Sequence, residues 1–214
     1  MRNNFDKLLL QLNDELTEMG NLIEAAINNA VNTLTDNGEY TESSARVIEK
    51  MVNQKEKDIE TLCLKILLQQ QPVAKDLRVV SSALKMITDM ERIGDQAEDI
   101  AEISLMLKNK KEYDNINEMA NATVQMVTDS IDAFVSKDSE LALSVINSDD
   151  LVDNLFDNVK ERATELIRQN SPDAEEIIDI IMIAKYFERI GDHATNIAEW
   201  VYFSITGEHK YANE

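Results

Sequence analysis

Two identical five-residue segments, "ERIGD", place carboxylates four residues apart in this chain of 214 residues. The first covers residues 91–95 and the second covers residues 188–192. On a helix, side chains at this spacing share one face, where like charges repel at a cost of roughly a few tenths of a kcal/mol. Because carboxylate oxygens are ligands of hard metal ions, a segment that keeps this repulsion twice is a candidate for binding a cation.

Each "ERIGD" segment belongs to a longer internal repeat. Residues 89–102 aligned with residues 186–199, an offset of 97, share nine identities in fourteen positions. The only two prolines, Pro72 and Pro172, precede the two copies at similar distances. Proline is tolerated in the first turn of a helix, because its missing N–H would have no partner there. We therefore expect each proline to mark the start of a long helix, with Ser171 capping the second one.

The composition predicts an all-α protein. Five Gly, two Pro and 5% aromatic residues leave few helix breakers and few strand formers. Short polar turns separate segments that are expected to be helical at roughly 3–35, 42–70, 73–108, 114–136, 139–169 and 172–205. Short connections make neighbouring helices antiparallel, which predicts two tandem three-helix up-down-up bundles. The first repeat is expected to span residues 1–110 and the second residues 111–214, with the boundary near 108–113.

The carboxylates of the two "ERIGD" helices lie opposite their apolar stripes. At 100° per residue, Asp95 falls about 40° from Glu91, whereas Ile93 and its apolar neighbours fall about 180° to 280° away. Glu188 and Asp192 hold the same relation in the second copy. The preceding helices carry matching polar stripes, formed by Glu49, Asn53, Glu56 and Glu60 in the first repeat and by Asp149 and Asp153 in the second.

Two interpretations of these stripes remain open. Antiparallel helices can bring their carboxylates together along a seam that a divalent or trivalent cation would neutralise, and oxygen ligands suit Fe, Mn, Mg or Ca and tolerate Zn. Alternatively, the acids are the solvated faces of amphipathic helices. Gly94 and Gly191 favour a close approach of a neighbouring helix, since a mid-helix Gly costs up to about 1 kcal/mol relative to Ala.

Several classes of function are disfavoured. A net charge of −20 argues against a nucleic-acid partner. His193 and His209 are the only histidines and neither follows a Glu by three residues, so a di-iron oxidase site is not expected. No catalytic motif is present, and we predict that the chain is not an enzyme and carries no organic cofactor. Cys63, in an apolar run, is predicted to be a packed thiol.

Localisation is predicted from what the sequence lacks. No window approaches the roughly 18 apolar residues of a membrane span. The first twenty residues lack the apolar region of a secretion signal. We therefore expect a cytoplasmic protein, with any membrane association indirect and through partners.

The repeats resemble the PhoU family of phosphate-uptake regulators. The resemblance covers nearly the whole chain and rests on "PVAKDLR" (72–78), "DMERIGDQAEDIAE" (89–102) and "YFERIGDHATNIAEWVYFSITGE" (186–208). It implies two similar three-helix bundles side by side, related by a pseudo-twofold axis. It also implies a negative regulator of the bacterial phosphate-starvation response, acting as an adaptor between the phosphate ABC transporter, through its ATPase subunit, and a sensor histidine kinase. We further expect a homodimer.

The resemblance also implies metal ligands from Glu/Asp-x-x-x-Asp motifs on two helices of each repeat. The ion could be Fe, Zn, Mn or Mg. The first repeat departs from the family pattern at Asn53, where Asp is usual, so weaker or fewer ions are expected there. Asp99, where Asn is more usual, could offset this loss. The residues carried over are Glu49, Glu91, Asp95 and Asp99 in the first repeat, and Asp149, Asp153, Glu188, Asp192 and Asn196 in the second.

Two alternative functions stay open at this stage. One is a metal-binding or metal-storage bundle unrelated to phosphate. The other is a structural scaffold whose acidic stripes are only solvated. Stoichiometric metal in the purified protein would argue against the scaffold.

Overall fold

The computed structural model describes residues 2–35, 42–70, 72–107, 114–169 and 174–210. Within these ranges all regular structure is helical, which confirms the all-α prediction. The helices are α1 (Arg2–Thr35), α2 (Glu42–Gln70), α3 (Lys75–Met106), α4 (Asp114–Ser136), α5 (Ser139–Arg168) and α6 (Ala174–Thr206). The predicted repeat boundary, residues 108–113, lies outside the described residues, between the end of α3 and the start of α4.

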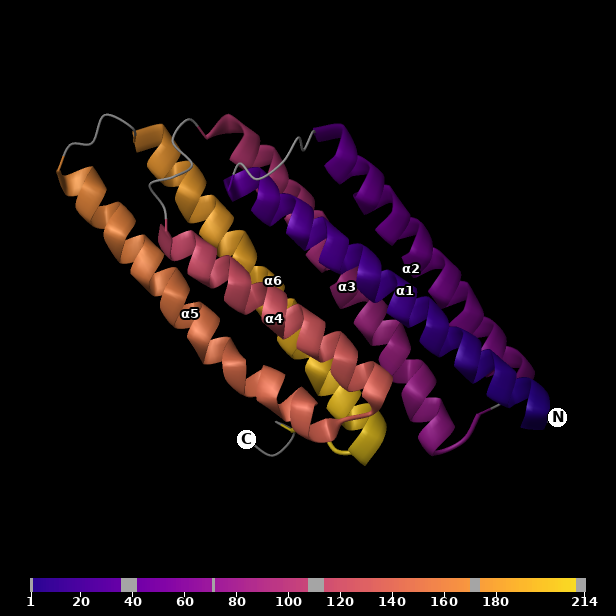
Figure 1. Ribbon diagram of the computed structural model, residues 1–214. Helices are drawn as coiled ribbons and strands as arrows, with labels where there is room; N and C mark the ends of the chain where they lie inside the picture. Colours follow the sequence, from indigo (N-terminus) through magenta and orange to yellow (C-terminus); the bar gives the residue numbers. More distant parts are fainter. Residues whose placement is uncertain (1, 36–41, 71, 108–113, 170–173, 211–214) are drawn as a thin grey trace.

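The six helices form two three-helix sets that pack side by side (Figure 1). Helices α1, α2 and α3 contact one another, and so do α4, α5 and α6. The two sets meet mainly where α3 lies against α6, and also where α1 lies against α4. Helices α2 and α5 form the two outer edges of the molecule (Figure 1). The two helices that carry "ERIGD" are therefore central neighbours, each flanked by the acidic helix of its own repeat.

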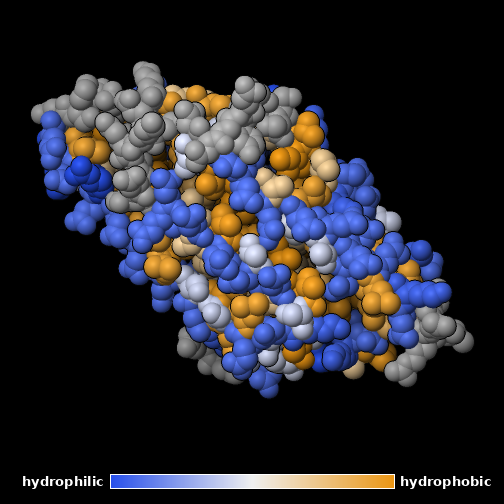
Figure 2. Space-filling model, in the orientation of Figure 1, coloured by the Kyte–Doolittle hydropathy of each residue, from blue (hydrophilic) through white to orange (hydrophobic). Residues whose placement is uncertain are grey.

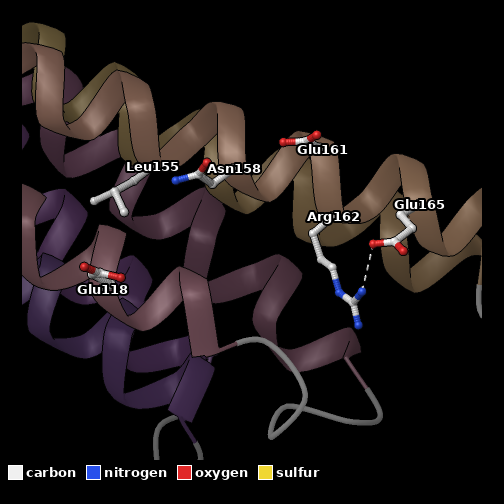
Figure 3. A pocket seen from close by; sticks show the side chains of 6 residues that line it. All are labelled: Glu118, Leu155, Asn158, Glu161, Arg162 and Glu165. Carbon is white, nitrogen blue, oxygen red and sulfur yellow. Dashed lines mark hydrogen bonds and ion pairs between the residues drawn. The ribbon is translucent and has the colours of Figure 1, made fainter.

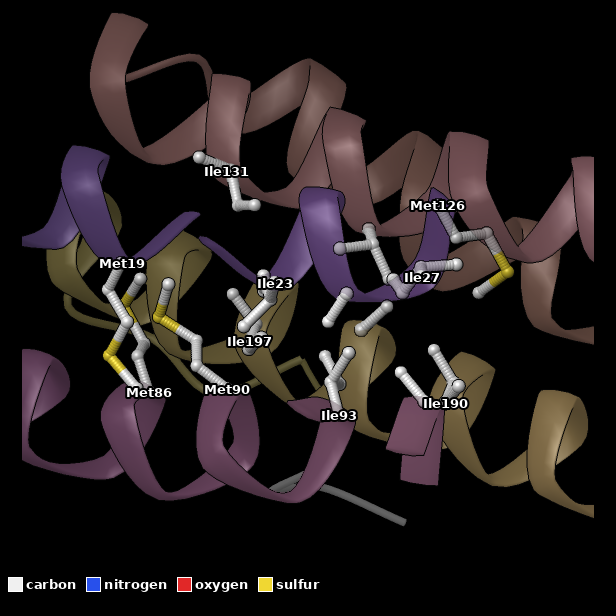
Figure 4. Packing of buried hydrophobic residues seen from close by; sticks show 14 of the residues in the cluster. Met19, Ile23, Ile27, Met86, Met90, Ile93, Met126, Ile131, Ile190 and Ile197 are labelled. Carbon is white, nitrogen blue, oxygen red and sulfur yellow. The ribbon is translucent and has the colours of Figure 1, made fainter. Parts of the chain in front are cut away.

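One apolar core runs through both repeats. Buried methionine and isoleucine side chains from α1, α3, α4 and α6 pack together around the contact between the two sets (Figure 4). They include Met19, Ile23, Ile27, Met86, Met90, Ile93, Met126, Ile131, Ile190 and Ile197. Each such burial contributes about 1.5–3 kcal/mol of transfer free energy. On the face formed by α1 and α4, smaller apolar patches lie between hydrophilic side chains (Figure 2).

The start of α3 differs from the prediction. Lys75 is the first helical residue, so Pro72 stands three positions before the helix and outside its first turn. Ala74 occupies the N-cap position with a φ of 47° and makes no side-chain capping hydrogen bond. Pro72 therefore belongs to the connection that leads into α3. The corresponding expectation for Pro172 and Ser171 concerns residues outside the described ranges.

The prediction for Cys63 is confirmed. Its side chain is fully buried in the core. Burial, together with the negative charge of Glu60, raises the pKa of the thiol to about 12. A thiol that stays protonated at neutral pH is a poor nucleophile and a poor metal ligand. Cys63 is therefore a packing residue.

Candidate functional site

The acidic helices approach the "ERIGD" helices at the two mid-helix glycines. A Cβ atom placed on Gly94 would lie 3.1 Å from Val52 Cγ1 of α2, and one on Gly191 would lie 3.4 Å from Val152 Cγ1 of α5. This confirms that the glycines allow a close helix approach. Val52 and Val152 immediately precede Asn53 and Asp153 of the polar stripes. Gly94 and Gly191 immediately precede the Asp of each "ERIGD" motif. The contacts between these valines and glycines therefore place the polar stripes of neighbouring helices side by side.

These contacts define two equivalent surfaces, which we call the first seam and the second seam. The first seam consists of Glu49, Asn53, Glu56 and Glu60 on α2 and of Glu91, Asp95, Glu98, Asp99 and Glu102 on α3. The second seam consists of the equivalent residues Asp149, Asp153, Phe156 and Lys160 on α5 and of Glu188, Asp192, Thr195, Asn196 and Glu199 on α6.

Carboxylates of the first seam act on one another across the two helices. Burial raises the pKa of Glu91 on α3, and the charges of Asp95, Glu56 and Glu49 add to the effect. Burial likewise raises the pKa of Glu98, with a further contribution from Glu49. Arg46 of α2 lies 3.8 Å from Glu98 and 3.2 Å from Glu102 of α3, so the two stripes face each other. The ionised seam is electrostatically strained.

An amide oxygen in the first seam lacks a hydrogen-bond partner. The Asn53 side-chain N–H₂ group donates to Glu49 Oε1 one turn earlier on α2. Asn53 Oδ1 is buried and accepts no hydrogen bond from any described residue. A buried acceptor without a donor is costly, by about 1–3 kcal/mol.

The second seam shows the same strain. Burial raises the pKa values of Asp149, Asp153 and Asp192, and the Glu188 charge raises each of them further. Thr195 Oγ1 donates a hydrogen bond of 3.2 Å to Asp149 Oδ1, which opposes the shift for that carboxyl. Glu188 is only 14% exposed, and its Oε2 atom is buried without a partner among the described residues.

Two of the predicted ligands lie at the contact between α3 and α6. The Asn196 amide donates to Asp89 Oδ1 at 3.1 Å, and Asp99 accepts a hydrogen bond from the Tyr186 hydroxyl. Both bonds link one repeat to the other. Asn196 and Asp99 are thus already engaged across the interface, and their role as metal ligands stays a prediction.

The sequence reasoning missed Asp89 and Tyr186. These residues occupy the same position of the two repeats, 97 residues apart. Each bonds the residue at the 99/196 position of the other repeat. In the sequence, these residues stand out only because the aligned position holds Asp in the first repeat and Tyr in the second.

Arginine supplies part of the counter-charge in the first seam. Arg92 lies 3.5 Å from Glu91 and 3.4 Å from Asp95, and Arg46 lies 3.2 Å from Glu102. Both arginine side chains are 55% exposed. Ion pairs in such positions are worth about 0–1 kcal/mol. Arg92 is therefore a surface ion-pair partner of the carboxylates on its own helix.

The seams offer oxygen atoms of the kind that hard cations accept as ligands. All the carboxylate and amide donors are oxygen atoms, and the two partnerless oxygens are Asn53 Oδ1 and Glu188 Oε2. In the ranges that the structure describes, however, no three His, Cys, Asp or Glu side chains stand close enough together to hold a metal ion. Metal binding at Glu49, Glu91, Asp95, Asp149, Asp153, Glu188 and Asp192 therefore also stays a prediction, and it would require the side chains to converge.

Two surface hollows lie away from the seams. One, of about 310 Å³, lies between α4 and α5 and is lined mostly by polar groups, with Arg162 paired to Glu165 at 3.0 Å (Figure 3). The other, of about 460 Å³, lies where the ends of α1, α3, α4 and α6 meet. Its wall includes Leu9, Leu12 and Phe134. Neither hollow is lined by a predicted metal ligand, but the second contains Lys75, Asp76, Ser204 and Ile205, which belong to the segments that carry the family resemblance.

The fold and the site define a protein built of two repeated three-helix bundles, with paired acidic seams beside its central helices. The PhoU domain model matches this chain twice, at residues 16–104 and 116–201. The chain belongs to the PhoU domain family. The two matches coincide with the two sets of helices and confirm the family resemblance and the repeat.

The similarity to known proteins extends along nearly the full chain. A phosphate-specific transport system accessory protein PhoU homolog of Pseudomonas aeruginosa is 34% identical, covering 95% of this chain and 86% of that one. The homolog of Clostridium acetobutylicum is 32% identical over 98% of both chains. The crystal structure of PhoU from Pseudomonas aeruginosa superposes with a TM-score of 0.90, at 33% identity over 95% of this chain and 100% of that one.

Proposed function

We propose that this chain is a non-catalytic accessory protein of phosphate transport that represses the phosphate-starvation response when phosphate is plentiful. Its partners would be the ATPase subunit of the phosphate ABC transporter and a sensor histidine kinase. The observation that carries the proposal is full-length similarity to proteins named as accessory to the phosphate-specific transport system. The match of fold and of both repeats supports the same function.

The charge of the molecule suits an adaptor with basic partners. The chain has a net charge of −20, and thirteen of its 41 acidic side chains lie on the two seams, where neighbouring charges raise the pKa values of Glu91 and Asp192. Complementary charge on a partner would speed the encounter and select the docking face. No helix in the described part of the chain is both long and apolar enough to cross a bilayer. Association with a transporter would therefore use these helix surfaces, with the chain acting as a homodimer in the cytoplasm.

Metal ions would bind at the seams and complete this function. Fe, Mn, Zn or Mg would be held by Glu49, Glu91 and Asp95 in the first seam, and by Asp149, Asp153, Glu188 and Asp192 in the second. The ion would neutralise the facing carboxylates and so fix the outer helices against the central ones. Asp99 and Asn196 would join only by giving up bonds to the other repeat.

Deletion of the gene in its host tests the regulatory function. Alkaline phosphatase activity and phosphate uptake should rise at high phosphate, and the wild-type gene should restore repression. A Glu188→Gln/Asp192→Asn variant should restore it poorly, whereas Asp58→Asn/Asp132→Asn, which removes two exposed charges away from the seams, should restore it fully. Unchanged repression after deletion would overturn the proposal and favour a metal-binding bundle unrelated to phosphate.

A pull-down from phosphate-replete cells tests the partners. The tagged chain should retain the transporter ATPase subunit and the kinase, and it should lose them as salt is raised, because exposed charges are screened. The Asp58→Asn/Asp132→Asn protein is the matched control and should retain both. Retention of neither protein at low salt would contradict the adaptor mechanism.

A further inference from the structure

The hollow of about 460 Å³, which we call the end pocket, is lined by residues of both repeats. The first turns of α1 and α3 and the last turns of α4 and α6 surround it, at the lower end of the molecule in Figure 1. Its volume is within the range of about 300–1,000 Å³ that is typical of small-molecule sites, which are mostly apolar with a few polar groups. The apolar side chains of its wall include Leu9, Leu12, Val79, Phe134, Val135 and Ile205.

One wall of the end pocket comes from a part of α1 that has no counterpart in α4. The segments "EMGN" (18–21) and "EMAN" (118–121) align at an offset of 100 residues. The first residue of α4, Asp114, is therefore equivalent to Asp14, whereas α1 already begins at Arg2. The additional residues, 2–13, lengthen α1 by about 18 Å. They supply the wall residues Leu9, Leu10, Leu12 and Asn13.

Four charged side chains line the pocket beside its apolar wall, namely Lys75, Lys137, Asp6 and Asp76. Both lysines and Asp6 are exposed, and Asp76 is half-buried. Within the part of the chain that the structure describes, none of the four forms an ion pair or a side-chain hydrogen bond. Two positive and two negative charges cancel, so the pocket carries no net charge in a chain whose net charge is −20. Both signs of charge are therefore available to a ligand.

The backbone holds both lysines of the pocket at unusual positions. Lys137 follows the last residue of α4 with a φ of 55°, in a turn closed by a hydrogen bond of 3.0 Å from the Asp138 N–H to the Ala133 carbonyl. Glycine is the usual residue at this point of a helix end, because a side chain makes the left-handed conformation costly. Ala74, directly before Lys75, is the only other non-glycine residue with a positive φ in the described ranges. Strained backbone at both lysines indicates that their positions serve binding.

We propose that the end pocket binds a zwitterionic amphiphile, with the apolar body against the wall and the head group among the four charged side chains. The anionic group of the head would pair with the two lysines, and its cationic group with the two aspartates. A head with a single charge would gain one pair of contacts and would be repelled by the other. Because both repeats line the pocket, the ligand would also stabilise the packing of one bundle against the other. The inference goes beyond the proposed function and does not depend on it.

Calorimetric titration of the full-length protein with three probes that share a decyl chain tests the ligand class. The probes are N-decyl-N,N-dimethylglycine, decanoate and decyltrimethylammonium, each used below its micelle concentration. The zwitterion should bind at one site, with a Kd at least about tenfold lower than that of either singly charged probe. Tightest binding of the cation would show that the net charge of the chain decides affinity and would overturn the proposal. Absence of saturable binding of the zwitterion would also overturn it and would leave the hollow to a side chain of a protein partner.

Substitutions in the wall test the place of binding. Val79→Phe fills part of the pocket and should weaken binding of the zwitterion by at least about tenfold. Leu10→Gln, at a lining position that is 65% exposed, should weaken it by about threefold without disturbing the core. Leu68→Gln is the matched control, because Leu68 is 80% exposed on α2, outside the pocket, and should leave binding unchanged. Equal affinities of wild type, Val79→Phe and Leu10→Gln would overturn the assignment to this pocket.

Removal of the two lysine charges tests the role of the head group. Lys75→Gln/Lys137→Gln should weaken binding of the zwitterion by about tenfold and strengthen binding of decyltrimethylammonium. Lys57→Gln/Lys65→Gln, at exposed positions of α2, is the charge-matched control, and equal effects of the two double variants would overturn the pairing.

Vesicles of phosphatidylcholine distinguish the two sources of such a ligand. Co-sedimentation of the wild-type protein that Val79→Phe abolishes would assign the ligand to a membrane lipid. Binding of the monomeric probe without co-sedimentation would assign it to a free compound. Either result upholds the pocket, and circular dichroism of each variant checks that the helices are retained.

Discussion

Asp89 of α3 forms a hydrogen bond of 2.9 Å with the imidazole of His193 on α6, and the two side chains are only 16% and 19% exposed. The same Asp89 oxygen accepts from Asn196. Tyr186 and Asp99 make the matching bond between the two repeats. Polar contacts on α3 and α6 therefore tie the repeats together beside the apolar core, and they fix the orientation of one seam relative to the other.

The Asp89–His193 pair should contribute measurably to stability. We expect Asp89→Asn to lower the free energy of unfolding by about 1–2 kcal/mol, because the shared carboxylate serves two donors. A double-mutant cycle with His193→Gln should give a coupling energy of about 0.5–3 kcal/mol. Urea denaturation at pH 7 measures both quantities. Asp132→Asn, at an exposed position of α4, is the control for loss of one charge. A coupling energy near zero would show that the Asp89–His193 hydrogen bond does not stabilise the contact between α3 and α6.

The metal-free protein should become less stable as the pH rises through the acidic range. Seam carboxylates with raised pKa values hold protons more tightly in the folded chain than in the unfolded one. Their stabilising contribution is complete below the ordinary carboxyl pKa of about 4 and is lost as the pH passes the raised values. The groups concerned are Glu56, Glu91, Glu98, Asp99, Asp149, Asp153, Asp192 and Glu199.

Urea midpoints in EDTA at pH 5 and pH 7.5 measure this effect. Glu91→Gln should reduce the difference between the two midpoints and should raise stability at pH 7.5 by roughly a few tenths of a kcal/mol, because a repelled charge is removed. Lys65→Gln, on the opposite side of α2, should leave the difference unchanged. A wild-type midpoint that is higher at pH 7.5 would show that the seams do not dominate the pH dependence.

Lys55 should stabilise the contact between α1 and α2. Its Nζ lies 2.7 Å from Glu15 and 2.6 Å from Glu18, and its side chain is 18% exposed. We expect Lys55→Met to lower the melting temperature, with a loss of about 1 kcal/mol, and raised salt should reduce the difference from wild type. Lys65→Met is the matched control on the same helix. Equal effects of the two substitutions would show that the paired glutamates are unimportant.

The helices and the internal repeat were predictable because both depend on local sequence. Apolar periodicity and the scarcity of breakers gave the helix order, and "ERIGD" at residues 91–95 and 188–192 gave the symmetry. The start of α3 was mistaken, because Pro72 was placed inside the first turn, whereas the helix begins at Lys75. Proline is compatible with either position, and local sequence does not decide between them.

The seams were only partly predictable. Helical spacing identifies which acids share a face, but not which side chains of another helix they meet. The bonds from Asp89 and Tyr186 to the opposite repeat depend on how α3 packs against α6, and this contact leaves no pattern within either helix. The contact between Lys185 of α6 and the Phe156 ring of α5 likewise depends on how these two helices pack.

Alanine at two helix-contact glycines should have opposite effects on stability. A Cβ atom on Gly20 of α1 would lie 2.8 Å from Ile131 Cγ2 of α4, whereas one on Gly191 would lie 3.4 Å from Val152. We expect Gly191→Ala to be neutral or stabilising by up to about 1 kcal/mol through helix propensity. Gly20→Ala should be destabilising by about 1 kcal/mol or more, because overpacking outweighs that gain.

Urea denaturation of the two variants measures the difference between these glycines. Adding Ile131→Leu to Gly20→Ala should recover part of the loss, because leucine lacks the Cγ2 methyl group that makes the closest contact. Ile131→Leu alone is the control for repacking of the core. If Gly20→Ala proved as stable as Gly191→Ala, the close approach of α1 to α4 would be too soft to determine how the two bundles pack.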